Sequence, residues 1–125
     1  MAILRRDDRV LMCHRQPNRG WIPNVWDFPG GHIEESETPP QALARELREE
    51  LGVDIEPPGR AADVVLEFDD ESLRLAVWIL DYGGAVENRC PEEHDKLRWV
   101  TLKDAGELEL ADKCYISLIG QALPH

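Results

Sequence analysis

The stretch that decides the fold covers residues 31–53 and reads GHIEESETPPQALARELREELGV. Thr38 precedes two prolines, so it gives a helix N-cap with proline at the first helical position, and Gln41 completes a capping box. Gly52 is the kind of residue that commonly ends a helix in the left-handed conformation. The sequence therefore predicts a helix over Pro39–Leu51.

The predicted helix has two chemically different sides. One is an apolar stripe that can pack on a core, formed by Leu43, Leu47 and Leu51. The other is a group of carboxylates that a repeat of about 3.6 residues per turn brings to one side, formed by Glu46, Glu49 and Glu50. Like charges at these spacings cost a helix a few tenths (~0.3) of a kcal/mol per pair, and a divalent cation would relieve the repulsion. Carboxylate oxygens are the ligands that Mg²⁺ and Mn²⁺ prefer. The alternative is that the acids only solvate the outer face of an amphipathic helix.

The same stretch resembles the Nudix box, which is written G, five residues, E, seven residues, R-E-U-x-E-E-x-G-U with U aliphatic. The specified positions match without a gap from Gly31 through Glu37 and Arg45 to Val53. This joint match favours catalytic metal binding by the glutamates, because a helix that is merely solvated on its outer face has no need of Gly31 or Glu37. The resemblance implies an α+β protein with the Nudix fold, an α-β-α sandwich with a mixed sheet between helices. It also implies hydrolysis of a diphosphate bond.

The resemblance implies a role for each box residue. Glu49 and Glu50 would bind Mg²⁺, with Mn²⁺ as a substitute, and Glu46 would be a ligand or the general base. Arg45 would orient a glutamate by ion pairing, which makes Arg45 and Glu46 the candidate catalytic residues. The backbone carbonyl of Gly31, in the Gly30-Gly31 turn, would complete the metal shell.

A second acidic segment, Pro91-Glu92-Glu93-His94-Asp95, lies just before a predicted strand over 97–101. Nudix proteins often supply one further glutamate from this region as a metal ligand or base, and we choose Glu93. Glu92 and Asp95 compete with it, as does an acidic loop without a role. A histidine such as His94 is more often a loop residue than a proton shuttle. The box alone leaves the base open between Glu46 and Glu93; we favour Glu46, because it lies on the helix among the metal ligands.

The box is preceded by Trp26-Asp27-Phe28-Pro29-Gly30, in which proline and glycine allow a tight backbone turn. Similar text leads into the box of MutT-like proteins, where the aromatic and its neighbours line a nucleoside pocket. Phe28 is therefore a pocket wall or an ordinary core residue, with neither favoured. Arg15 and Phe28 are our candidates for substrate binding.

The rest of the chain predicts strands and one more helix. One strand is expected to start at Ala2-Ile3-Leu4 and to continue through residues 9–14. Two further strands, 62–68 and 72–81, are expected on either side of an acidic turn. Residues 16–29 read as a long ordered loop, and residues 111–123 as a closing helix. No internal repeat or break in composition appears, so we expect a single domain over residues 1–125.

Composition limits the class of partner. The net charge of -11 would repel polymeric nucleic acid and anionic lipid, whereas a phosphorylated small molecule could bind through divalent cations. The longest apolar run, 75–80, is far short of a membrane span, and charges interrupt any signal peptide near the start. Three cysteines without metal spacing favour reduced thiols, and we expect a cytoplasmic monomer or homodimer.

Markers of several Nudix subfamilies are missing, including the run after the box of NADH diphosphatases and the distal proline of ADP-ribose diphosphatases. The chain therefore resembles the short MutT-like group, and we expect hydrolysis of a nucleoside triphosphate, oxidised ones included, to monophosphate and diphosphate. Alternatives are a diphosphatase for sugar nucleotides or dinucleotides and a regulatory nucleotide-binding domain without hydrolysis. A further alternative is an isomerase of prenyl diphosphates with the same fold, but the intact Nudix box of this chain does not suit that class of enzyme.

Overall fold

The computed structural model describes residues 1–18, 23–30, 34–59, 62–68 and 71–123, with the backbone alone for 62–68 and 71–75. The strands are β1 (Ala2–Arg6), β2 (Arg9–Arg15), β3 (Trp26–Asp27), β4 (Ala62–Phe68), β5 (Glu71–Asp81) and β6 (His94–Val100). The helices are α1 (Pro39–Leu51), α2 (Leu102–Ala105) and α3 (Tyr115–Ala122).

The strands form one mixed sheet in the order β3-β2-β1-β5-β4, with β6 pairing with β2 off this path. β1 lies parallel to β5, and the other pairs are antiparallel. A parallel pair needs a crossover connection, and here α1 lies on the chain between the two strands. The crossover thus carries the box helix to one face of the sheet.

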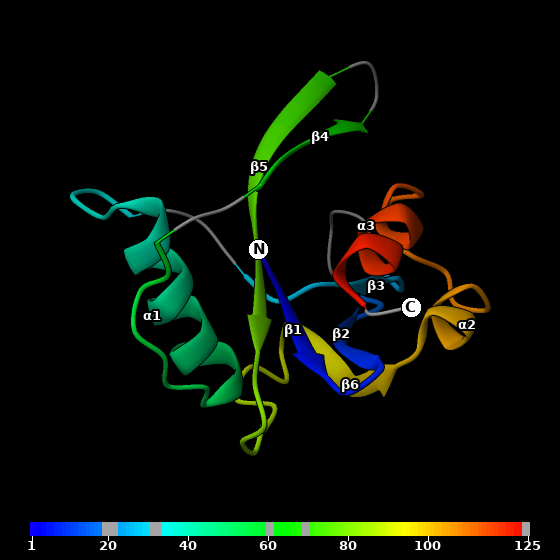
Figure 1. The fold of residues 1–125 in the computed structure, drawn as a ribbon, viewed down its shortest axis with the longest axis horizontal. Helices are drawn as coiled ribbons and strands as arrows, with labels where there is room; N and C mark the ends of the chain where they lie inside the picture. Colours follow the sequence, from blue (N-terminus) through cyan, green and yellow to red (C-terminus); the bar gives the residue numbers. More distant parts are fainter. Residues whose placement is uncertain (19–22, 31–33, 60–61, 69–70, 124–125) are drawn as a thin grey trace.

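Helices cover both faces of the sheet, α1 on one side and α2 with α3 on the other (Figure 1). Alternate residues of β1 and β2 point to opposite faces, as strand geometry requires. Ile3, Val10 and Met12 pack toward α3, whereas Leu4, Leu11 and Cys13 pack toward the leucines of α1. This arrangement confirms the predicted α-β-α fold with a mixed sheet between helices.

The box helix has the predicted bounds because its end signals are local. Thr38 Oγ1 accepts from the Gln41 backbone N–H at 3.3 Å, and Gln41 Oε1 accepts from the Thr38 N–H at 3.0 Å. Gly52 adopts φ 67 and ends the helix in the left-handed conformation. Leu43, Leu47 and Leu51 are buried, as the predicted stripe requires.

Several predicted boundaries were wrong. The single strand expected from residue 2 to 14 is a hairpin of β1 and β2, in which Asp7 takes a positive φ of 56. Two turn residues were therefore read as strand. The loop over 16–29 contains β3, the turn helix α2 was not predicted, and the closing helix begins at Tyr115 rather than at 111. β6 begins at His94, so the acidic segment extends into a paired strand.

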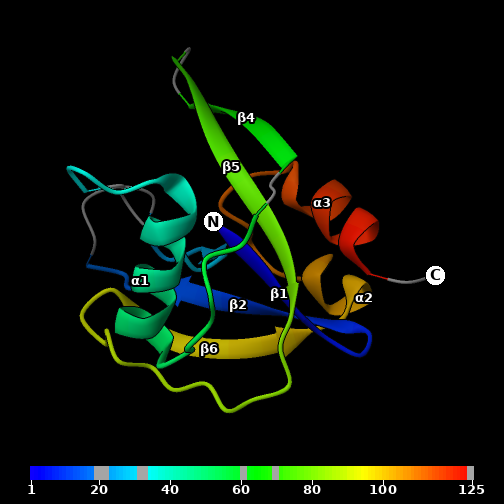
Figure 2. The ribbon, with the colours of Figure 1, turned by 60° about the vertical axis from the view of Figure 1, so that its left-hand side comes forward.

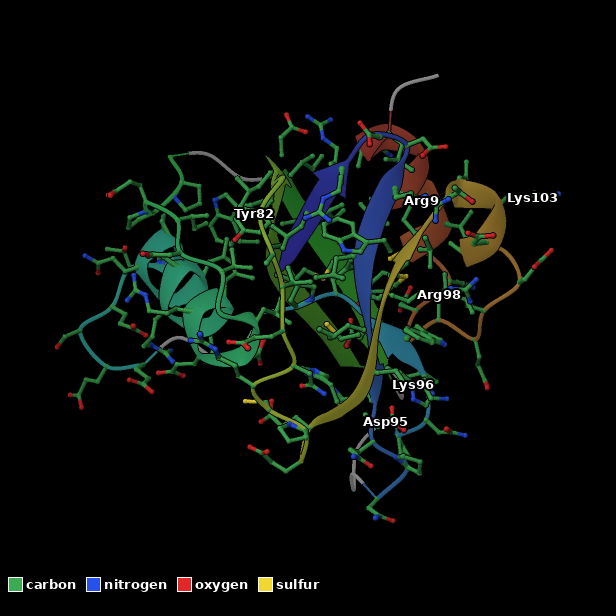
Figure 3. The ribbon with its side chains drawn as sticks, turned by 90° about the horizontal axis from the view of Figure 1, so that it is seen from below. Arg9, Tyr82, Asp95, Lys96, Arg98 and Lys103 are labelled. Carbon is green, nitrogen blue, oxygen red and sulfur yellow. The ribbon has the colours of Figure 1, made fainter. Side chains whose placement is uncertain are left out.

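Two parts of the sheet lie at its margins. The outer ends of β4 and β5 extend beyond the rest of the molecule in both ribbon views (Figure 1, Figure 2). β6 carries exposed Lys96 and Arg98 on the outside of the sheet (Figure 3), and such charges discourage pairing with another chain.

Across the described residues, no helix has the length and apolar content to cross a membrane. All three cysteines are free.

Candidate active site

The turn before the box is held tightly against the core. Gly30 has a φ of 140, and a Cβ on it would come within 2.7 Å of the Met1 Cα, so a side chain does not fit there. The Gly30 N–H points at Glu50 Oε2 at 3.4 Å. Pro29, next to it, accepts from the Ala2 N–H at 2.8 Å. The turn is therefore packed against the start of β1, and its Gly30 N–H faces the Glu50 side chain of α1.

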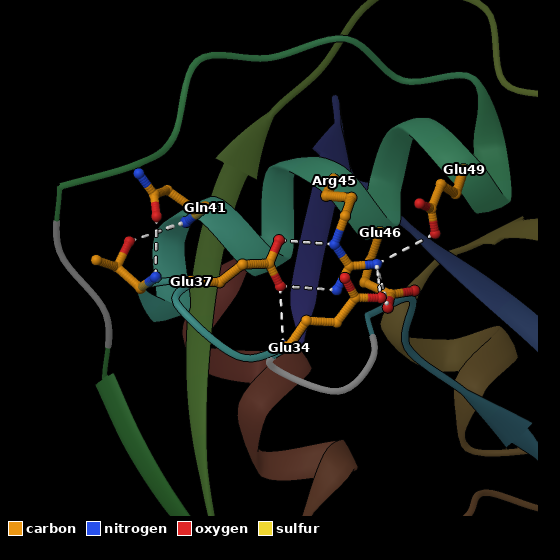
Figure 4. A network of polar contacts seen from close by, with 7 residues as sticks. Glu34, Glu37, Gln41, Arg45, Glu46 and Glu49 are labelled. Atoms are coloured by element: carbon orange, nitrogen blue, oxygen red, sulfur yellow. Dashed lines mark hydrogen bonds and ion pairs between the residues drawn. The ribbon is translucent and has the colours of Figure 1, made fainter.

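Arg45 is the centre of a network of carboxylates (Figure 4). It donates to Glu37 through Nε at 2.7 Å and through Nη2 at 2.9 Å, a two-bond geometry that only a guanidinium provides. Its Nη1 donates to Glu46 Oε1 at 3.0 Å and to Glu49 Oε2 at 3.2 Å. The hydrogen bonds from Arg45 hold the pKa of Glu37 below its usual value. Arg45 thus ties the segment before α1 to two glutamates of the helix.

Glu50 lies apart from this network, on the inner side of α1. It is 4% exposed, whereas the Glu49 side chain is 57% exposed. Burial, followed by the charge of Glu46, raises the pKa of Glu50 to about 8, and hydrogen bonding and charge from Glu93 add to this effect. A buried carboxylate with two acidic neighbours has a surplus of negative charge. Helix spacing alone predicted that the three glutamates of the box lie on one side of α1. In the structure Glu50 is buried and Glu49 is exposed, so they do not form one solvated face.

The loop before β6 brings Glu93 to Glu50. This loop is tied to the end of α1 by two backbone bonds, from the Glu87 N–H to the Leu51 carbonyl at 3.0 Å and from the Arg89 N–H to the Glu50 carbonyl at 2.8 Å. Of the three candidates in the acidic segment, Glu93 is the one beside Glu50. Glu92 is exposed, and Asp95 pairs with His14 Nδ1 at 2.6 Å.

Among the described residues, Glu50, Glu93 and His94 form a group that could hold a metal ion. Each offers one ligand atom, and these atoms all lie within 4.8 Å of one another. His94 is 5% exposed. Sequence reasoning gave His94 no metal role, because its direction depends on its pairing with Arg15 in β2. The one feature of the sequence that could have indicated a metal role for His94 is its position next to Glu93, a predicted metal ligand.

The other predicted site residues have separate surroundings. Gly31, the predicted carbonyl ligand, lies outside the described residues. Arg15 is 8% exposed and places Nη1 3.8 Å from Asp27 Oδ2. Phe28 is 5% exposed and packs on Tyr115, with ring centroids 4.9 Å apart, as part of the core under α3. The substrate-binding roles of Arg15 and Phe28 stay predictions.

The fold and the box agree with comparisons to known proteins. The model of the NUDIX domain family matches residues 1–119. The chain therefore belongs to the Nudix family, and it is a Nudix hydrolase of the MutT-like kind.

Two curated relatives carry names that describe an activity. The chain is 33% identical over 111 residues to the CTP pyrophosphohydrolase of Escherichia coli (strain K12), across 88% of this chain and 79% of the relative. It is 36% identical over 79 residues to the 8-oxo-dGTP diphosphatase of Proteus vulgaris, across 63% of this chain and 70% of the relative. Both relatives are named as enzymes that cleave diphosphate linkages.

Solved structures show the same fold. The solution structure of the Escherichia coli ORF135 protein aligns with a TM-score of 0.71 at 31% identity, covering 95% of this chain and 82% of that one. The crystal structure of the MutT protein from Methanosarcina mazei Go1 aligns with a TM-score of 0.80 at 23% identity, covering 97% and 88%. The latter likeness concerns the fold alone.

Proposed function

We propose that this Nudix hydrolase cleaves a nucleoside triphosphate to the monophosphate and diphosphate with the help of Mg²⁺. The observation that carries the proposal is the contact of Glu50 with Glu93, which joins the box helix to a distant acidic loop. A buried carboxylate beside a half-buried one costs stability on its own, so a ligand that needs both is the simplest reason for their contact. Similarity to a CTP pyrophosphohydrolase and an 8-oxo-dGTP diphosphatase supports the nucleotide class.

The residues fit a divalent cation. Glu50 and Glu93 offer hard carboxylate oxygens, which suit Mg²⁺ or Mn²⁺. Glu50 lies in the last turn of α1, where the helix dipole favours positive charge. The proposed set of ligands also includes Glu46, Glu49 and the Gly31 carbonyl. When bound, the cation would neutralise phosphate charge and make a water molecule more acidic.

The chain's own residues would then orient the reactants. Arg45 fixes Glu46 and Glu49 from the side of the helix, so that their carboxylates are positioned before substrate arrives. A carboxylate oxygen of Glu46 would accept the proton of the attacking water. Arg15 and Phe28 are the candidates for contact with the substrate.

The experiment is a comparison of substrates. Purified protein with Mg²⁺ is incubated with CTP, 8-oxo-dGTP, a sugar nucleotide and a dinucleotide, and the products are separated by chromatography. The proposal predicts that a triphosphate is the preferred substrate and that monophosphate and diphosphate appear in equal amounts. Exclusive cleavage of the sugar nucleotide or dinucleotide would contradict it, and ¹⁸O-labelled water would identify the attacked phosphorus.

A further inference from the structure

The backbone of His94 is fixed more firmly than a loop position requires. Its N–H donates to the Cys90 carbonyl at 3.0 Å, and its carbonyl accepts from Asn88 Nδ2 at 2.6 Å. It also begins β6 and pairs with Arg15. The side chain is 5% exposed and starts from a position with little freedom. Such a residue can present a ring nitrogen in one direction.

That direction is toward the carboxylates. One ring nitrogen of His94 shares the 4.8 Å group with an oxygen of Glu50 and an oxygen of Glu93. The group contains an imidazole as well as carboxylates, so it is not merely an acidic cluster. Imidazole suits Co²⁺ and Zn²⁺, whereas Mg²⁺ favours oxygen alone.

A second buried histidine shows what a structural role looks like in this fold. His14 on β2 is 8% exposed, its Nδ1 lies 2.6 Å from Asp95 Oδ1, and its ring lies tilted against Trp26 with the ring centroids 5.0 Å apart. These contacts occupy His14 with a carboxylate outside the metal-binding group. The two histidines are therefore a matched pair for experiment.

We propose that His94 supplies a nitrogen ligand to the divalent cation held by Glu50 and Glu93, so that the site accepts Co²⁺ or Zn²⁺ more readily than an all-oxygen site would. This inference rests on the proposed function in one respect, the binding of a divalent cation. It adds a residue from β6 to the ligands drawn from the helix and the loop.

The test uses Co²⁺ as the probe, with the full chain stripped of metal beforehand. A histidine bound to Co²⁺ gives a strongly shifted proton resonance that disappears in D₂O. We expect this resonance in the wild type and in His14→Gln, and its loss in His94→Gln and His94→Asn. Calorimetry should also show that the preference for Co²⁺ over Mg²⁺ falls at least about tenfold in the His94 variants, while His14→Gln keeps it.

The outcomes separate this inference from the proposed function. Persistence of the shifted resonance in both His94 variants, or its absence from wild-type protein that has bound Co²⁺, would overturn the nitrogen ligand. If wild-type protein in that case still hydrolyses a nucleotide with Mg²⁺, the proposed function stands. A wild type that binds neither Co²⁺ nor Mg²⁺ would overturn both.

Discussion

Arg45 binds Glu37 through two parallel hydrogen bonds, from Nε at 2.7 Å and from Nη2 at 2.9 Å, while its Nη1 reaches Glu46 at 3.0 Å. One guanidinium thus sets the positions of a residue before the helix and a residue within it. A lysine at this position would keep the positive charge but could not form the two parallel hydrogen bonds.

Arg45→Lys should therefore lower kcat by at least about tenfold, because a misplaced carboxylate costs more in turnover than in folding. The unfolding free energy should change little, because partly exposed ion pairs contribute little to stability. Steady-state kinetics and thermal unfolding measure the two effects. Arg48→Lys is the control, since exposed Arg48 lies on the same helix and forms an ion pair with exposed Asp54 at 3.1 Å. Equal kcat values for both variants would contradict the orienting role.

Glu50→Gln should change how the stability of the metal-free protein depends on pH. The pKa of Glu50 is raised to about 8 in the folded state. The folded state therefore holds its proton more tightly than the unfolded state, and the resulting stability is present at acidic pH and lost as pH rises through about 8. We expect the wild type to lose on the order of 3 kcal/mol from this group between pH 4.5 and pH 9, and the variant to lose less.

Urea unfolding in EDTA across this pH range measures the difference. Glu49→Gln serves as the control, because the Glu49 side chain is 57% exposed. It should follow the wild type. Parallel pH profiles for the wild type and Glu50→Gln would show that Glu50 ionises freely in the folded protein.

How far the sequence predicts the fold depends on how local each signal is. The bounds of α1 were predicted correctly because Thr38, Gln41 and Gly52 are all adjacent to the helix ends they determine. The hairpin between β1 and β2 was missed because Asp7, without glycine or asparagine beside it, adopts the positive φ of the turn. The short helix α2 begins with a capping box at Thr101 that was overlooked.

The site shows the same division. The spacing of the glutamates within the box was sufficient to predict that they lie on α1. The burial of Glu50 and its contact with Glu93 depend on how the crossover and the loop before β6 meet, which no local pattern encodes. His94 needed the register between β2 and β6 to be known before its direction could be inferred. Long-range pairing was thus the missing information.

The choice of general base can be tested with Glu46→Gln and Glu93→Gln. Because Glu46 lies on the rigid helix and is fixed by Arg45, its loss should lower kcat more steeply than the loss of Glu93. The rate against pH should keep its acidic limb in Glu93→Gln and lose it in Glu46→Gln. If the limb instead vanishes in Glu93→Gln alone, the loop supplies the base.

Metal dependence follows from the surplus of acidic groups. Mg²⁺ or Mn²⁺ should restore turnover to protein treated with EDTA, because the carboxylates otherwise repel the phosphates. Ca²⁺ should bind yet support little hydrolysis, since its coordination is longer and looser. Initial rates in each metal measure this. Undiminished turnover in excess EDTA would show that hydrolysis does not need a divalent cation.

Whether Glu50 belongs to the catalytic metal site can be measured from the turnover of Glu50→Gln with a nucleoside triphosphate and Mg²⁺. Gln keeps the size of the side chain, but it cannot ionise to give the carboxylate that would bind the cation. Glu56→Gln is the matched control, because Glu56 is exposed and lies beyond the helix. We expect kcat to fall at least about a hundredfold in Glu50→Gln and to be unchanged in Glu56→Gln. Wild-type turnover in a folded Glu50→Gln protein would contradict it.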